Sequence, residues 1–316
     1  MMRTSWNGLG AVRWLAIAAA SIAATMSIAG ARAFAADAQQ ETFSAPEQAV
    51  DALIRADRGG NTAELLKILG PESEKLISSG DPVADKAGRN RFAAAYDASH
   101  KLENQGADKV SLIVGKEDWP YPIPLVRKGS LWRFDTKAGE NEILTRRIGR
   151  NELKVIQVCR AYVEAQREYA AKDRLGSGHL EYAQHLLSTS GNHNGLYWPV
   201  GAGEEQSALG PLMAKARAAG YFAKDNESAP FYGYYYKILT RQGPNAPGGA
   251  KDYVVDSHMT GGFAMLAFPA KYGDSGIMTF IVNQNGIVYQ KDLGPETASI
   301  ANNITQFDPD TTWKTP

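Results

Sequence analysis

Residues 151–172, NELKVIQVCRAYVEAQREYAAK, form the longest run of helical periodicity in the chain. Asn151 is a favourable N-cap, and the glycines at positions 176 and 178 are expected to end the helix after Lys172. The side of this helix that is expected to be buried contains Leu153, Ile156, Cys159 or Arg160, Val163 and Ala170.

The residues before this long helix predict helices followed by a small sheet. Ser44 to Glu47 has the pattern of a capping box and is expected to open the first helix, which ends at Gly59-Gly60. Further helices are expected at 62–69 and 83–99, and strands at 110–114, 123–127 and 131–134. The three prolines between Trp119 and Pro124 predict an extended loop without regular pairing.

The residues after the long helix predict two more helices and then a mainly β segment. Helices are expected at 179–187, 211–219 and 297–304, and strands at 231–240, 253–255, 263–268, 277–282 and 287–290. Asn283 to Gly286 is expected to join the last two strands as a tight hairpin. The order of elements predicts an α+β protein of two small domains, each with helices packed on an antiparallel sheet, which share a long central helix.

The first 35 residues have the organisation of a secretory signal peptide. Arg3 and Arg13 supply the positive region, 14–24 is an apolar run, and Ala33-Phe34-Ala35 fits a signal-peptidase site. The expected mature protein is periplasmic or secreted from a bacterium and has no stable membrane insertion, although retention of the segment as an anchor is the alternative. Its predicted domains are 36–150 and 151–316.

The composition excludes several classes of protein. The 34 basic and 34 acidic residues give no net charge, so a nucleic acid is not an expected partner. The single cysteine excludes a disulfide framework and a multi-cysteine metal cluster. A hydrophobic fraction of 44% with 22% charged residues is typical of a globular chain.

No complete catalytic constellation is visible in the sequence. Gly273-Asp274-Ser275-Gly276 copies a string found in serine proteases, and His258 and Asp256 are available as a base and an acid. The same four residues are also typical of a polar turn, and the other signatures of that protease fold are absent. No catalytic residue is therefore predicted, and the chain is not expected to be an enzyme on these grounds.

Asp173, Ser177 and Glu181 form a weak candidate for a cation site. Their spacing resembles a calcium-binding loop, but Leu175 stands at one ligand position, and Gln184 replaces the bidentate glutamate at the end. A hard cation needs more oxygen ligands than this loop offers, so no metal or cofactor is expected.

Aromatic residues in loops and at strand ends are the candidate contact surface. Five residues in three loops are proposed as binding residues: Trp119, Tyr121, Tyr197, Trp198 and Asn245.

Several motifs in the second half resemble a known bacterial secreted family. They include CRAYVEAQ from Cys159, EYAQ from Glu181, GLYWP from Gly195, FYGYYY from Phe231 and QGPNAPGGA from Gln242. The motifs MTFIVN from Met278 and KDLGP from Lys291 complete the pattern. The chain closely resembles the family called domain of unknown function 2950, which implies an envelope location and transfers no catalytic residue. More loosely, the second half is similar to the globular part of pilin-like proteins, and the first half to cystatin or nuclear-transport-factor folds.

Three functional hypotheses follow from the sequence. The first is a non-enzymatic module that binds another envelope protein or surface component. The second is a small-ligand-binding protein or hydrolase with a pocket in the N-terminal sheet, where an acid such as Asp118 or Asp256 would need a raised pKa. The third is a structural module stabilised by calcium.

Overall fold

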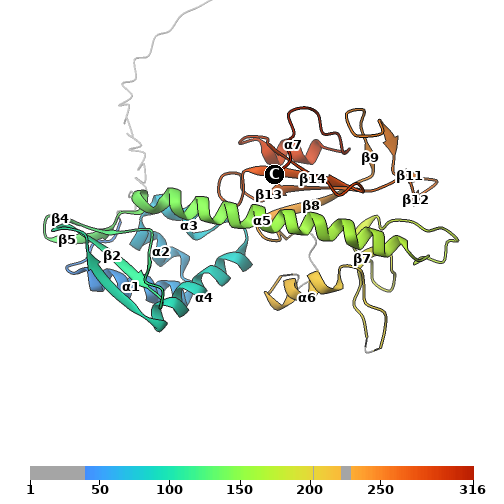
Figure 1. The fold of residues 1–316 in the computed structure, drawn as a ribbon. Helices are drawn as coiled ribbons and strands as arrows, with labels where there is room; N and C mark the ends of the chain where they lie inside the picture. Colours follow the sequence, from blue (N-terminus) through green and yellow to red (C-terminus); the bar gives the residue numbers. More distant parts are fainter. Residues whose placement is uncertain (1–39, 202, 222–228) are drawn as a thin grey trace, which may run out of the picture. The chain divides into compact units, whose positions relative to one another are not determined.

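The computed structural model describes residues 40–201, 203–221 and 229–316 (Figure 1). The predicted signal peptide, residues 1–35, lies outside these residues. The described part contains helices and mainly antiparallel sheets, which confirms the α+β class. No helix in these three ranges is both long enough and apolar enough to cross a membrane.

Four helices and a 3-10 turn precede the first sheet. They are α1 (Pro46–Gly59), α2 (Thr62–Leu69), η1 (Pro71–Ser73), α3 (Glu74–Ile77) and α4 (Pro82–Ala98). The predicted capping box does not form, because Ala45 is the N-cap and the Ser44 hydroxyl donates to the Gln48 side chain instead. Asn61 and Asp81 cap α2 and α4 by accepting from the backbone amides of Glu64 and Ala84.

The first sheet has five antiparallel strands in the order β1-β2-β4-β5, with β3 paired to β2. Its strands are β1 (His100–Asn104), β2 (Lys109–Val114), β3 (Trp119–Pro120), β4 (Leu125–Lys128) and β5 (Leu131–Phe134). The expectation of an unpaired loop from Trp119 was wrong for its first two residues, which pair with Val114 and Ile113. A proline is accommodated there because β3 is a two-residue strand that pairs with β2 alone. The next residue stays bonded to β2, since the Tyr121 amide donates to the Leu112 carbonyl at 2.7 Å.

Helix α5 (Thr136–Ala170) is a continuous 35-residue helix, drawn in green in Figure 1. The predicted start at Asn151 was wrong, because Asp135 caps the helix by accepting from the amide of Ala138. Asn151 is instead a buried interior residue whose side chain donates to the carbonyl of Ser275 at 2.9 Å. Gly139 and Gly149 lower the helix propensity of the part of α5 before Asn151, so the sequence pattern did not predict a helix there.

The buried face of α5 also differs from the expected one. Leu153 is 65% exposed, whereas the buried residues are led by Val155, Cys159, Tyr162 and Tyr169. Gln166 lies on the same face and is fully buried, because its amide exchanges hydrogen bonds of 2.8 Å with the backbone of Ala183. Cys159 and Val163 are buried as expected, so the predicted face was correct at these positions and wrong at Leu153.

Two hydrophobic clusters are built along the described chain. One consists of residues between Phe43 and Phe134, and the other of residues between Val155 and Phe307. Helix α5 contributes to both, since Ile143 packs on the first cluster and Val155 belongs to the second. The predicted domain boundary after residue 150 therefore falls inside a continuous helix.

The second sheet is four-stranded and antiparallel, in the order β15-β14-β13-β8. Its strands are β8 (Tyr234–Leu239), β13 (Ala264–Pro269), β14 (Met278–Asn283) and β15 (Val288–Asp292). The expected hairpin between the last two strands is confirmed by the pairing of Val282 with Val288. β8 starts later than predicted, because Tyr232 and Gly233 have positive φ angles of 54° and 78°.

Two helices and three short strand pairs complete the described structure. The helices are α6 (Gly210–Ala218) and α7 (Thr297–Asn303), both close to their expected ranges. The pairs are β6 (His185–Leu187) with β7 (Gly195–Tyr197), β9 (Arg241–Gln242) with β10 (Lys251–Asp252), and β11 (Val254–Val255) with β12 (His258–Met259). The helix expected at 179–187 was wrong, because His185 to Leu187 forms a strand that pairs in parallel with β7.

Candidate functional site

A pocket of about 640 Å³ lies among α1 to α4, residues 119–123 and α5. Its volume is within the range of small-molecule sites. Helix α4 is mostly accessible, since Tyr96 is the one buried residue among its 17. The residues of α4 that line the pocket include Ala84, Ala87, Gly88 and Ala95, whose small side chains leave the space open.

The floor of the pocket is apolar. It is formed by aliphatic side chains of α1, α2, α3, α5 and the segment between β3 and β4, together with one ring from α4. These floor residues are Leu53, Leu65, Leu69, Leu76, Ile77, Phe92, Ile123 and Ile143. Such a surface gains free energy when it covers an apolar ligand, at about 25 cal/mol per Å².

The rim of the pocket is strongly cationic. Six basic and two acidic residues line the pocket; the basic ones are Arg89, Arg91, Arg146, Arg147, Arg150 and Lys154. Arg146 pairs with Glu142 and lies over the Trp119 ring at 5.6 Å. Arg147 donates to the backbone carbonyls of Lys75 and Leu76, so it holds α3 against α5.

Arg91 and Arg150 differ from these two, because the part of the chain that the structure describes gives neither guanidinium a hydrogen-bond acceptor. No carboxylate forms an ion pair with either guanidinium anywhere in residues 40–201, 203–221 and 229–316. Partial burial and the neighbouring Arg91 lower the pKa of Arg150. Two like charges beside each other at the mouth of an apolar pocket make a favourable position for an anion.

Asp57 is the unusual acid of this pocket. It lies near the end of α1, its carboxyl group has no hydrogen-bond partner in the described part of the chain, and its Oδ2 atom is buried. Burial raises the pKa of Asp57 to about 6, against the opposing effect of the Arg89 charge. Asp85, the other acid of the lining, is fully engaged by the backbone amide and hydroxyl of Ser79 at 3.0 and 2.7 Å.

The acids expected to act in a cleft are not at this pocket. Asp118 is exposed and pairs with Lys101 at 3.0 Å, and Asp256 is an exposed turn residue with a φ of 49°. Asp57 was not predicted as a site residue, because an aspartate near the end of an amphipathic helix usually faces solvent.

Two of the five predicted contact residues come together at the pocket. Trp119 and Tyr121 both line it, and the Tyr121 ring lies 5.0 Å from that of Phe92. They therefore form part of a concave site and not of a protruding loop surface.

The other three predicted contact residues lie elsewhere. Trp198 is only 4% exposed and packs against His193, with ring centroids 4.5 Å apart. Tyr197 lies under the Arg217 guanidinium, 5.2 Å from its ring centroid. Asn245 is exposed and bonds to Asp308 through its amide nitrogens at 2.8 and 3.1 Å.

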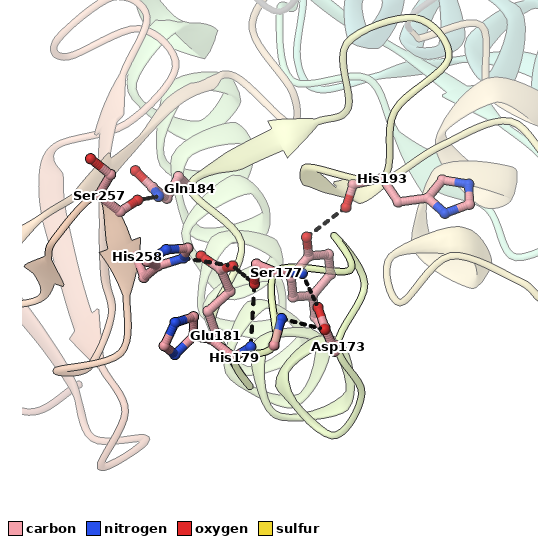
Figure 2. A network of polar contacts seen from close by, with 10 residues as sticks. Asp173, Ser177, His179, Glu181, Gln184, His193, Ser257 and His258 are labelled. Atoms are coloured by element: carbon pink, nitrogen blue, oxygen red, sulfur yellow. Dashed lines mark hydrogen bonds and ion pairs between the residues drawn. The ribbon is translucent and has the colours of Figure 1, made fainter.

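The weak cation candidates form a closed hydrogen-bond network, which Figure 2 shows. The Asp173 carboxylate accepts from the amides of Ser177 and Gly178 at 3.1 and 2.8 Å. Buried Glu181 uses Oε1 for the Ser177 hydroxyl and for Nδ1 of His258, both at 3.0 Å. Over the described ranges, no group of three or more potential ligand residues is arranged to hold a metal ion. The network ties residues 173–181 to the turn between β11 and β12.

A chelator is therefore expected to leave the melting temperature unchanged. The oxygens of Asp173 and Glu181 already have protein donors, so calcium would have to displace existing hydrogen bonds without a full set of ligands. Differential scanning fluorimetry with and without EDTA measures this. A fall of several degrees that added calcium reverses would show that the loop binds the ion.

The two nucleophile candidates are structural. Ser275 is fully buried, and its hydroxyl bonds to the backbone of Lys271 as donor and acceptor, which closes the expected polar turn. Cys159 is fully buried, and burial raises the pKa of its thiol to about 12. Neither group can supply a nucleophile at neutral pH in this environment.

Comparison with known proteins identifies a family over nearly the whole described chain. The family described as "Protein of unknown function (DUF2950)" matches residues 40–315. Neither the curated proteins nor the solved structures gave a match. The looser likenesses to pilin-like, cystatin and nuclear-transport-factor folds stay predictions.

Proposed function

The chain belongs to the DUF2950 family, and since that description states no activity, we propose from the pocket itself that the protein binds a small amphipathic anion. The apolar part of the ligand lies against the floor of the pocket, and its anionic group lies at Arg91 and Arg150. This proposal develops the hypothesis of a small-ligand pocket, although that pocket was expected in the N-terminal sheet and the observed one lies mainly among helices.

One observation favours an amphipathic anion over a purely polar or a purely apolar ligand. Among the described residues, Arg91 and Arg150 have no anionic partner, and they lie next to leucine, isoleucine and phenylalanine side chains of the pocket. A purely polar ligand would leave the floor without a partner, and a purely apolar one would leave the guanidinium pair uncompensated. A straight-chain fatty acid has both parts and is the simplest probe.

Export to the bacterial envelope, expected from residues 1–35, remains part of the proposal. In that compartment the ligand would come from the amphiphiles that surround the protein. Binding of another envelope protein, the first hypothesis from the sequence, is less favoured, because Trp198 is buried and Trp119 and Tyr121 line a concave site.

The double variant Arg91→Ala/Arg150→Ala is expected to bind decanoic acid about tenfold more weakly than the wild type. That factor corresponds to about 1.4 kcal/mol, a reasonable value for two partly exposed charges. Isothermal titration calorimetry below the micelle concentration measures the affinity. Added salt should weaken binding to the wild type more than binding to the variant, because salt screens the guanidinium pair.

Lys128→Ala/Arg133→Ala is the matched control. It removes the same charge from exposed positions on β4 and β5 that do not line the pocket. If both double variants lose the same affinity for decanoic acid, the effect is due to net charge, and Arg91 and Arg150 are not the anion site. Absence of fatty-acid binding to the wild type would overturn the proposed function.

A further inference from the structure

The pocket has a second polar position besides its arginine rim. Asp57 presents its carboxyl group from α1, whereas Arg91 and Arg150 lie on α4 and α5. The charge that acts on Asp57 is that of Arg89, and the charge that acts on Arg150 is that of Arg91. The acid and the guanidinium pair therefore come from three different helices that line one cavity.

The Asp57 carboxyl group lacks the partners that buried acids ordinarily have. Its Oδ2 is buried without a hydrogen bond, and within the described ranges no donor reaches either of its oxygens. Arg89 lines the same pocket and forms neither an ion pair nor a hydrogen bond with it in that part of the chain. A carboxylate that is desolvated and unpartnered costs free energy, which a donor on a bound molecule would recover.

We infer that the ligand carries an O–H or N–H donor at the end remote from its anionic group, and that this donor binds the Asp57 carboxylate. The inference rests on the proposed function, because it assigns the far end of the same ligand. A plain methyl end would cover the carboxylate and leave it without any partner. A hydroxyl or an amine end satisfies it and selects ω-substituted acids over simple fatty acids.

The test compares the fatty acids from hexanoic to dodecanoic acid with their ω-hydroxy and ω-amino derivatives. The series of chain lengths is needed so that one member matches the spacing of the two polar positions. At the best length, the wild type is expected to bind a derivative about tenfold more tightly than the methyl-ended parent, as a hydrogen bond to a charged group allows. Calorimetry at neutral pH gives each affinity.

Two variants of Asp57 separate the possible donors. Asp57→Leu removes the acceptor and is expected to abolish the preference for either derivative. Asp57→Asn keeps an oxygen acceptor but no charge, so it should retain the preference for a hydroxyl end and lose that for an amine end. Asp51→Asn, an exposed change on the same helix outside the pocket lining, should behave as the wild type.

The outcomes distinguish this inference from the proposed function. If the wild type binds fatty acids but prefers the methyl end at every length, the role of Asp57 is wrong and the pocket function stands. A preference that survives in Asp57→Leu overturns the inference as well. If no acid of the series binds, the proposed function fails and the inference falls with it.

Discussion

The variant Ala87→Trp is expected to bind decanoic acid at least about a hundredfold more weakly than the wild type. Ala87 is on α4 and lines the pocket, so an indole at this position would occupy the space above the apolar floor. Each methylene group excluded from an apolar site costs about 0.8 kcal/mol, so the exclusion of four costs about 3 kcal/mol. That free energy corresponds to roughly a hundredfold in affinity.

The matched control is Ala94→Trp on the same helix. Ala94 is exposed and does not line the pocket, so its replacement adds the same indole without filling the cavity. The control should bind decanoic acid with wild-type affinity. Circular dichroism melts of both variants establish that they are folded, and wild-type affinity in a folded Ala87→Trp variant would place the ligand elsewhere.

Asp57→Asn is expected to stabilise the protein at neutral pH by about 1 to 2 kcal/mol, less than the full pKa shift implies, because the carboxyl group is partly exposed and solvent screens its charge. The pKa of Asp57 is about 6 in the folded chain, against an ordinary value of 3.8. Each pKa unit corresponds to about 1.4 kcal/mol of difference between the two protonation states. The neutral amide of asparagine has a similar shape and carries no charge that burial would desolvate. The Asp57 carboxylate, which is proposed to bind the ligand, therefore reduces the stability of the free protein.

The size of this effect depends on pH, whereas its direction does not. Below pH 4 the carboxyl group is protonated in both the folded and unfolded chains, so Asp57 contributes no penalty. Between pH 4 and pH 6 the unfolded chain releases its proton while the folded chain keeps it, and the free energy of unfolding falls as pH rises. Above pH 6 the penalty is complete, and the advantage of Asp57→Asn should be at its largest.

Urea unfolding of both proteins at several values between pH 3.5 and pH 8 measures this difference. Asp81 and Asp274 also have raised pKa values, but they are present in both proteins and cancel in the comparison. Asp51→Asn serves as the control, since an exposed amide should change stability little at any pH. If the free energies of unfolding of Asp57→Asn and the wild type differ by the same amount at every pH, the claim that the Asp57 carboxyl group has a raised pKa is contradicted.

Elements whose pattern is local were predictable from the sequence. Strands β13 and β14 are continuous apolar runs, and the hairpin after β14 carries an Asn-Gly turn, so each was identified close to its observed range. β1 was missed because HKLEN is a largely exposed edge strand, and its pairing with β2 determines its conformation. The start of α5 was missed for a related reason, since contacts with η1 and α3 stabilise a segment that carries two glycines.

The pocket could be predicted only in part. Trp119 and Tyr121 were selected as binding residues because exposed aromatics are common in recognition sites, and both line the cavity. The arginine pair was missed, because Arg91 and Arg150 come from different helices that only the tertiary fold brings together. Asp57 was missed because its burial depends on α4 and on residues after β3, far from it in the sequence.

Photolabelling with a fatty acid that carries a diazirine on its chain tests the central claim most directly. The label is expected to attach to α1, α4 and the 119–123 segment, at residues such as Leu53 and Phe92 that line the pocket. Peptide mass spectrometry locates the attachment, and an excess of unlabelled decanoic acid should prevent it. Saturable labelling confined to residues outside the lining, around Tyr197 or Asn245 for example, would contradict the assignment of this pocket as the binding site.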